Sequence, residues 1–398
     1  MPSSPSLALR RARLGTALLF LTNGALFANI LPRYPEIKSA LGLDAATYGL
    51  AIAAFPAGAI AAGLTAAMFV RRFGSARVAV VGTVIVSLSL LAAGLAPSAV
   101  LFALALLLGG AADSITDVAQ NAHSLRVQRG YARSIINSFH AIWSAGAVLA
   151  GAMAAAAIAL GLPLGIHLSI SAVIFVIVSL VAARLCLPGR DEAGEAPDAP
   201  HAVADKKPRV TARTVFILLA LVLIAIAGAV VEDAGMSWAT LYLGSDLGAP
   251  AALAAVGYIS LVGAQFVGRL VGDRLVDRFG QRTIARAGGA IVAVGMGLAL
   301  AFPTVPGTIV GFMAAGFGVA TLIPAVLQAA DALPGLRHGA GLTIVSWLLR
   351  LGFLLAPPLV GLIADNAGLR AGLLVVPIAG LVAILFAGVL EGRRQPEN

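Results

Sequence analysis

Residues 134–183 read SIINSFHAIWSAGAVLAGAMAAAAIALGLPLGIHLSISAVIFVIVSLVAA, a stretch of fifty residues without Asp, Glu, Lys or Arg. A helix needs about 20 apolar residues to cross a bilayer, so this stretch is expected to hold two crossings. The turn signal Gly161-Leu162-Pro163 lies between them. Because backbone within hydrocarbon must form its hydrogen bonds internally, we expect both crossings to be α-helices.

Apolar runs of this kind continue along the whole chain, which has 398 residues, 60% of them hydrophobic and 11% charged, with a mean hydropathy of +0.97. A soluble protein of this length needs more charge to cover its surface. We therefore predict an all-α membrane protein with about twelve transmembrane helices in two six-helix bundles. The predicted spans are 14–32, 47–70, 78–95, 99–125, 134–160, 164–186, 214–242, 250–273, 284–302, 307–330, 339–364 and 371–391.

Basic residues predict the orientation of these spans. With a cytoplasmic N-terminus, the outside loops hold only Arg33, Lys38 and Arg370. The inside segments hold far more basic residues: those of the 184–213 connection and Arg10, Arg11, Arg13, Arg71, Arg72, Arg77, Arg126, Arg129, Arg133, Arg274, Arg278, Arg282, Arg286, Arg337, Arg393 and Arg394. This asymmetry predicts a multi-pass membrane protein with both termini in the cytoplasm. The N-terminal basic residues could also begin a signal peptide, but eleven further spans favour a first transmembrane helix.

The net charge of +9 is spread in short clusters between apolar runs, so we expect no nucleic-acid partner. The single cysteine, Cys186, excludes an intramolecular disulfide and a cysteine-based metal cluster. We find no HExxH, CxxC or Gly-rich phosphate loop, and no nucleophile–base set. The sequence therefore predicts no cofactor, no metal and no enzymatic activity.

The most hydrophilic segment predicts how the chain is divided. Residues 188–213 carry five acids and four prolines, which is typical of a flexible linker. The predicted domains are an N-terminal bundle at 1–187, a cytoplasmic linker at 188–213 and a C-terminal bundle at 214–398. Phe73-Gly74 recurs 206 positions later as Phe279-Gly280, and Leu41-Gly42 recurs as Leu247-Gly248 at the same offset. The recurrence indicates a duplication, and internal repeats are typical of transporters.

One cytoplasmic loop carries the clearest motif, Gly272-Asp273-Arg274-Leu275-Val276-Asp277-Arg278-Phe279-Gly280-Gln281-Arg282. It resembles the loop motif G-x-x-x-D-R-x-G-R-[KR] of the major facilitator superfamily. The resemblance implies a conformational latch formed by Asp273, Asp277, Arg278, Gly280 and Arg282. In the first half, Arg71 stands where the family usually has the acid, which puts a second latch in doubt. The alternative is that these charges only determine how the chain is oriented across the membrane.

Within that superfamily the chain resembles fucose-permease-like transporters and related bacterial permeases. Span four reads Asp117-Val118-Ala119-Gln120-Asn121, similar to their acid-x-A-x-N segment, and span five reads Asn137-Ser138-Phe139-His140, similar to their N-x-x-Q. Proton-driven drug exporters of the superfamily usually carry an arginine early in span four, and residues 99–112 contain no basic residue. The resemblance therefore implies uptake rather than efflux.

Acids within the spans are candidate functional groups, because a charge at the bilayer centre costs at least about 2.5–3.5 kcal/mol. Asp113, Asp117 and Asn121 lie four apart and form one polar stripe on span four. We predict proton coupling at Asp117 and Asp113; the alternative is structural acids bonded to neighbouring helices. The fucose-permease pattern has a further acid in span one, where this chain has Asn29.

The predicted substrate-binding residues are polar or aromatic side chains within the spans: Asn29, Asn121, Asn137, His140, Glu232, Trp238 and Arg350. Each has an alternative. His140 could be a core histidine, Trp238 is slightly favoured as an interfacial anchor, and Arg350 could bind an anionic substrate or pair with Glu232 or Asp117. Gly235 could allow a helix break near the site, and Arg269 is expected to join the cytoplasmic charges around Asp273. Trp143 is assigned to packing.

Together these features predict a secondary active transporter that moves a small polar solute, sugar-like or a small organic anion, by alternating access. The expected partners are this solute, a proton as co-substrate and the lipid bilayer, and we expect a monomer. Two rivals stay open: a proton-driven exporter of drugs or metabolites, and a transporter-like sensor that moves nothing.

Overall fold

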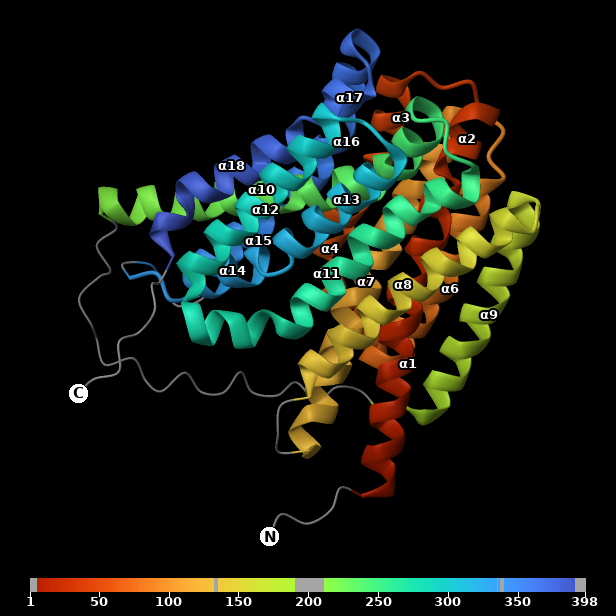
Figure 1. Ribbon diagram of the computed structural model, residues 1–398. Helices are drawn as coiled ribbons and strands as arrows, with labels where there is room; N and C mark the ends of the chain where they lie inside the picture. Colours follow the sequence, from red (N-terminus) through yellow and green to blue (C-terminus); the bar gives the residue numbers. More distant parts are fainter. Residues whose placement is uncertain (1–5, 132–134, 190–210, 335, 337–339, 391–398) are drawn as a thin grey trace. The chain divides into compact units, whose positions relative to one another are not determined.

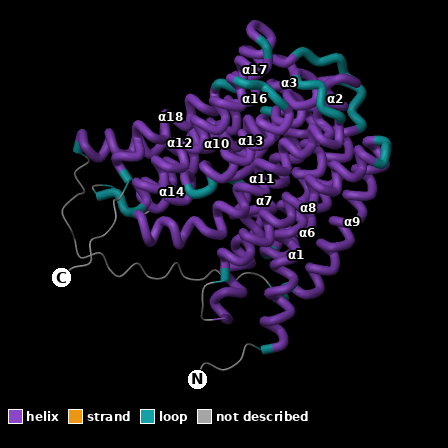
Figure 2. Tube along the Cα trace, viewed as in Figure 1, coloured by secondary structure: helices purple, strands orange, loops and turns teal. Residues whose placement is uncertain are grey.

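The computed structural model describes residues 6–131, 135–189, 211–334, 336 and 340–390. The described part consists of helices joined by short loops and contains no strand (Figures 1 and 2). The all-α prediction is confirmed.

Twelve segments of the described chain are long and apolar enough to cross a membrane. They confirm the prediction of about twelve spans, and each overlaps one predicted span. The segments are Leu7–Ala40, Ala45–Gly63, Ser75–Gly94, Ala99–Tyr131, Ser138–Ala159, Leu164–Leu185, Ala212–Asp246, Ala251–Gly272, Gln281–Ala301, Val305–Asp331, Ala340–Ala367 and Leu369–Val389.

The chain divides into two compact units. The first comprises Met1–Leu43 with Ala51–His201, and the second comprises Asp44–Leu50 with Ala202–Asn398. The short segment Asp44–Leu50 thus belongs to the second unit, although it precedes most of the first in sequence. The predicted linker at 188–213 falls largely on residues outside the described part, so its character stays a prediction.

In the first unit, α7 packs against α6 and α4, and α1 packs against α8 and α9. The bounds are α1 Leu7–Ile30, α2 Tyr34–Ala40, α3 Ala45–Ile52, α4 Ala54–Gly63, α5 Ala66–Phe73, α6 Ser75–Gly94, α7 Ala99–Tyr131, α8 Ile136–Ala159 and α9 Leu164–Leu185, with the 3₁₀ turn η1 at Leu31–Arg33. The start of α3 lies in the second unit.

In the second unit, α12 contacts α13 and α18, and α10 contacts α16 and α18. The bounds are α10 Ala212–Leu241, α11 Ala251–Phe279, α12 Gln281–Ala301, α13 Val305–Val319, α14 Leu322–Asp331, α15 Ala340–Leu348, α16 Arg350–Ala367, α17 Leu369–Gly372 and α18 Val375–Phe386, with the π-helical turn η2 at Tyr242–Asp246 and the 3₁₀ turn η3 at Ala387–Val389.

The same turn recurs in both units where two helices meet. Gly74 lies between α5 and α6 with φ 86° and ψ 144°, and Gly280 lies between α11 and α12 with φ 83° and ψ 153°. This region of backbone space is nearly restricted to glycine. Gly42 and Gly248, the other pair at the 206 offset, also have positive φ, 62° and 67°. The repeat expected from sequence therefore extends to backbone conformation.

Close packing of α1 against α8 positions the polar groups described below. A Cβ atom added at Gly24 would overlap the carbonyl oxygen of Trp143, and one added at Gly146 would overlap that of Leu21. Small residues let two helix backbones approach in this way. Side chains next to these glycines can consequently bond across the helix pair.

Candidate functional site

Polar side chains follow one side of α7, in the fourth membrane-spanning segment. The helix runs for 33 residues, so positions three and four apart lie on the same side. Asn121 Nδ2 donates to Asp117 Oδ1 at 3.0 Å and to the Asp117 carbonyl oxygen at 2.8 Å. Gln120 Nε2 donates to Asp117 Oδ1 at 3.2 Å. The structure thus brings together three of the polar residues of this span.

Asn23 of α1 connects this stripe to the other acid of α7. Asn23 Nδ2 donates to Asp113 Oδ1 at 2.8 Å, and Asn23 Oδ1 accepts from Gln120 Nε2 at 3.2 Å. The same oxygen accepts from Trp143 Nε1 of α8 at 2.8 Å. Two carboxamides, Asn23 and Gln120, therefore join the two acids Asp113 and Asp117; we call this arrangement the carboxamide chain.

Three residues of this network, Asn23, Gln120 and Trp143, are not among the site residues predicted from the sequence. Asn23 lies in the same apolar run as Asn29, and both amides gave the same signal of a polar group within a span. Trp143 was assigned to packing, but its indole N–H forms a hydrogen bond to the carboxamide chain. Only the approach of α1 to α8 shows which of these side chains meet.

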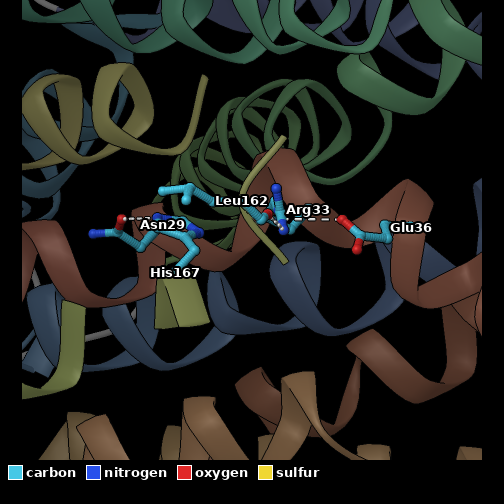
Figure 3. Close-up of polar contacts among 5 residues, drawn as sticks. All are labelled: Asn29, Arg33, Glu36, Leu162 and His167. Carbon is cyan, nitrogen blue, oxygen red and sulfur yellow. Dashed lines mark hydrogen bonds and ion pairs between the residues drawn. The ribbon is translucent and has the colours of Figure 1, made fainter. Parts of the chain in front are cut away.

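Asn29 binds neighbouring groups of the first unit (Figure 3). It is 1% exposed, its Nδ2 donates to the carbonyl oxygen of Ala25 at 3.1 Å, and its Oδ1 lies 3.0 Å from His167 Nε2. Both ends of the carboxamide are thus engaged by α1 and α9. The hydrogen bonds of Asn29 do not connect it to the acids of α7, and its role in substrate binding stays a prediction.

Arg33, in the turn η1, lies close to this pair in Figure 3. It is 3% exposed and belongs to the segment Leu7–Ala40. Its Nη2 donates to the carbonyl oxygen of Leu162 at 2.8 Å, and its Nε lies 3.1 Å from Glu36 Oε2. Arg33 therefore connects the end of α1 to the loop between α8 and α9.

The α8 candidates are only partly described. His140 is exposed, and its ring meets Phe20 edge-on at 5.3 Å between centroids. Ser144 Oγ donates to the His140 carbonyl oxygen at 3.2 Å. The side chain of Asn137 lies outside the described part of the chain. The roles of His140 and Asn137 in binding stay predictions.

In the second unit, Glu232 of α10 is 7% exposed and pairs with Arg269 of α11, with 3.6 Å between Oε1 and Nη2. The sequence did not predict this pair. The side chain of Asp273 is not described, so the grouping of Arg269 with Asp273 stays a prediction. Glu232, one of the partners considered for Arg350, is thus engaged by a different arginine.

The neighbourhood of Glu232 corrects one expectation. α10 continues through Gly235 to Leu241 without a break. A Cβ atom at Gly235 would overlap the side chain of Leu261 on α11, so the glycine provides space for helix packing instead. The adjacent Asp233 has a buried Oδ2 with no hydrogen-bond partner among the described residues.

Trp238 is fully buried, so its interpretation as an interfacial anchor is wrong: an anchor must reach the membrane–water boundary. Its ring meets that of Tyr48 edge-on, with 4.9 Å between centroids, and the Tyr48 hydroxyl donates to the Ser237 carbonyl oxygen at 2.9 Å. Both residues belong to the second unit. A substrate-binding role for Trp238 stays a prediction.

Arg350 is the first residue of α16, where the eleventh membrane-spanning segment is interrupted. α15 ends at Leu348, and the Gly352 N–H donates to the Leu349 carbonyl oxygen at 2.9 Å. Leu349 keeps helical dihedral angles, φ −59° and ψ −27°, so the interruption is slight. The guanidinium of Arg350 is the feature at this position that favours an anion.

The loop motif after α11 is described except for the side chain of Asp273. Asp277 and Arg278 are exposed, and the Arg278 guanidinium lies 5.2 Å from the Phe279 ring centroid. Arg282 Nε donates to the carbonyl oxygen of Leu390 at 3.0 Å, and this bond ties the start of α12 to the end of the described chain. The latch function stays a prediction.

Within the described ranges, no group of three or more His, Cys, Asp or Glu side chains could hold a metal ion.

Comparison with known proteins identifies the family. The model of the Major Facilitator Superfamily matches residues 16–276 and 262–398. The chain is 30% identical to an uncharacterised transporter, y4wD, of Sinorhizobium fredii over 93% of its own length and 96% of the relative's. It is 27% identical to the membrane protein MosC of Rhizobium meliloti over 96% and 91% of the two chains.

Solved structures share the fold at low sequence identity. A point mutant of the nucleoside transporter NupG superimposes with a TM-score of 0.75 at 13% identity, covering 95% of this chain and 98% of NupG. A D-xylose–proton symporter gives a TM-score of 0.69 at 16% identity, covering 95% of each chain. The family consists of transporters and the relative y4wD is named as one, which also separates the chain from enzymes. The chain therefore belongs to the Major Facilitator Superfamily of membrane transporters.

Proposed function

We propose that the chain is a secondary active transporter that moves a small polar solute, sugar-like or a small organic anion, by alternating access with a proton as co-substrate. The observation that carries the proposal is the carboxamide chain. It joins Asp113 and Asp117, two acids within one membrane-spanning helix, to α1 and α8. An ionisable group within a membrane-spanning helix costs free energy, so its presence favours a functional role.

The named structural relatives support the solute class. One transports nucleosides and another is a symporter of D-xylose and protons. Nucleosides and sugars are polar and uncharged, whereas Arg350 at the start of α16 favours a substrate with an anionic group. The resemblance to fucose permeases supports uptake as the direction of transport. We therefore keep sugar-like solutes and small organic anions as the two substrate classes.

The arrangement of basic residues supports the topology. Arginines cluster at the connections after α5 and α11, at Arg71, Arg72, Arg274 and Arg278. We propose a bacterial inner-membrane protein with both termini and these connections in the cytoplasm, acting as a monomer. Fusion of a reporter that is active only outside the cytoplasm, at the loops near residues 42 and 248, tests the orientation.

The proposed function is tested by transport in liposomes. The purified chain is reconstituted, a pH gradient is imposed, and a pooled mixture of sugars, nucleosides and small organic acids is offered. We expect at least one solute to accumulate, and we expect Asp117→Asn to abolish the gradient-driven accumulation while exchange of preloaded solute continues. Asp331→Asn, an exposed acid at the end of α14, is the matched control.

The outcomes separate the rivals. Gradient-driven accumulation that Asp117→Asn leaves unchanged would remove Asp117 from the coupling site. Extrusion of solutes in place of accumulation would favour an exporter. A properly folded chain that moves no solute in either direction would favour a sensor.

A further inference from the structure

The indole N–H of Trp143 fixes the orientation of a carboxamide in the first unit. An indole nitrogen donates a hydrogen bond and does not accept one. It lies 2.8 Å from Asn23 Oδ1, so the atom facing Trp143 must be the carboxamide oxygen. The Asn23 nitrogen then faces Asp113 Oδ1, at 2.8 Å. Trp143 thus determines that Asn23 is a donor to Asp113.

The same constraint extends to Gln120. Its Nε2 lies 3.2 Å from Asn23 Oδ1 and 3.2 Å from Asp117 Oδ1. If the Gln120 carboxamide turned over, Oε1 would face Asn23 Oδ1, and two acceptor oxygens would meet without a proton between them. Gln120 is therefore also constrained to donate, and the direction of every bond in the carboxamide chain follows from one indole N–H.

The fixed direction of these hydrogen bonds favours the ionised form of the two acids over the protonated form. Amide N–H groups stabilise an ionised carboxylate, but they cannot accept a hydrogen bond from a protonated carboxyl group. Gln120 Oε1 is buried and has no hydrogen-bond partner in the described part of the chain. A protonated Asp117 could bond to this oxygen only after Gln120 turns, which requires breaking its bond to Asn23.

In the described part of the first unit, the arginines on the helices packed against α7 lie near helix ends. The helices packed against α7 in the first unit are α1, α4, α5, α6 and α8. Their arginines lie in the first turns of α1 and α6 and the last turn of α5, at Arg10, Arg11, Arg13, Arg71, Arg72 and Arg77. His140 is the other titratable group on these helices, and His123, Arg126, Arg129 and Tyr131 lie toward the end of α7.

We propose that Trp143 is a positioning residue for proton coupling: by bonding to Asn23 it keeps Asp113 and Asp117 as hydrogen-bond acceptors, so that proton uptake is linked to a change at the α1–α8 contact. The inference rests on the proposed proton coupling and adds a residue and a mechanism to it. Asp113 and Asp117 are the groups that exchange protons, and Trp143 acts on them through Asn23 and Gln120.

The test is an infrared pH titration of the full-length chain in lipid nanodiscs, which detects protonated carboxyl groups directly and needs no transported solute. Asp113→Asn and Asp117→Asn assign the bands. In Trp143→Phe, Asn23 and Gln120 can turn together, so that Asn23 accepts from a protonated Asp113. We expect Asp113 of this variant to be half-protonated at a higher pH than in the wild type. The proton concentration at the midpoint should be about fivefold lower, which corresponds to the free energy of one hydrogen bond. Trp347→Phe, an exposed tryptophan of α15, should leave the titration unchanged.

A second measurement does not depend on a core variant. In the wild-type chain labelled with ¹⁵N-tryptophan, the indole N–H resonance of Trp143 should shift with the titration of the acids, while that of Trp347 should not. Trp238→Phe and Trp347→Phe assign the three tryptophan signals. A Trp143 resonance that stays constant while Asp113 titrates would overturn the proposal.

The outcomes for the two proposals are distinct. Identical titrations of Trp143→Phe and the wild type, in a protein that retains pH-driven uptake, would overturn the role of Trp143 and leave proton coupling intact. A shifted titration in a protein that shows no pH-driven uptake would show that Trp143 positions the acids, but it would overturn proton coupling and with it the part of Trp143 in that coupling.

Discussion

Glu232 and Arg269 show how charge is accommodated in a membrane-spanning region of the second unit. The Glu232 side chain is 9% exposed and that of Arg269 is 35% exposed. A buried acid is costly unless an opposite charge or hydrogen-bond donors compensate it. The 3.6 Å contact between α10 and α11 supplies that compensation, although Arg269 keeps access to its surroundings.

Removing the charge of Glu232 should destabilise the second unit modestly. We expect Glu232→Gln to lower the free energy of unfolding by about 1–2 kcal/mol, between the values for exposed and buried pairs, because Arg269 is one-third exposed. Thermal unfolding of the purified chain, followed by tryptophan fluorescence, measures the loss. Arg269→Gln and the double variant complete a cycle; additive losses would show that the two side chains do not interact.

At Arg350, the shape of the cation should matter as well as its charge. Arg350→Lys keeps the positive charge but removes the planar fork that binds a carboxylate through two hydrogen bonds. If the substrate is an anion, we expect KM to rise at least about tenfold with little change in kcat. Uptake measured in liposomes provides both constants. Unchanged KM for every transported solute would exclude the anion clamp and favour a neutral, sugar-like substrate.

The acids of α7 could be predicted from sequence, but the groups that orient them could not. Asp113 and Asp117 were selected because an ionisable residue within an apolar span is rare and costly. Asn23 and Trp143 are ordinary residues of their spans, and their hydrogen bond depends on the close approach of α1 and α8 at Gly24. The sequence contains the donors and acceptors, whereas tertiary packing decides which of them meet.

At the scale of elements, the turn glycines of the two units determine how successive helices connect. Gly280 is the last cap of α11 and the first cap of α12, with φ 83° and ψ 153°. Its N–H donates to the Val276 carbonyl oxygen at 2.7 Å. The turn therefore closes one helix and begins the next within a single residue, next to Arg282, whose side chain reaches Leu390.

A side chain at Gly280 should strain this turn. We expect Gly280→Ala to cost about 1–3 kcal/mol, because L-residues rarely adopt this conformation. Gly263→Ala is the matched control: Gly263 lies within α11, and an added Cβ meets no atom within 4 Å. Alanine is also the better helix former, so this variant should be neutral or slightly stabilising. Equal melting temperatures for the two variants would show that the Gly280 turn can relax.

The sequence was sufficient to predict that the helices exist, but not where they are interrupted. Twelve apolar runs were sufficient to predict the spans because the length of a membrane helix is set by bilayer thickness. The break between α15 and α16 at Leu349 has no Pro or Gly at its centre, so the local sequence gives no signal for it. The predicted break at Gly235 is absent because Leu261 fills the space that the glycine leaves.

At the scale of the whole molecule, Asp44–Leu50 is the segment whose place the sequence did not predict. It precedes most of the predicted second span, yet it belongs to the second compact unit. Asp365 Oδ1 and Oδ2 accept from the backbone N–H groups of Ala45 and Ala46 at 2.8 and 2.7 Å. A carboxylate at a helix N-terminus satisfies N–H groups that lack helical partners and interacts favourably with the dipole.

The cap joins two parts of the second unit that lie far apart in sequence. Removing the carboxylate with Asp365→Ala should weaken the attachment of α3, by about 1 kcal/mol for the lost cap. We expect amide hydrogen exchange across Asp44–Leu50 to become about fivefold faster, while exchange in α7 stays unchanged. Asn366→Ala is the matched control, because the Asn366 side chain bonds only within its own helix, to the Leu362 carbonyl oxygen at 2.8 Å among the contacts described. If exchange in Asp44–Leu50 is the same in Asp365→Ala and the wild type, the carboxylate does not hold the segment, and the aromatic contact between Tyr48 and Trp238 becomes the principal attachment.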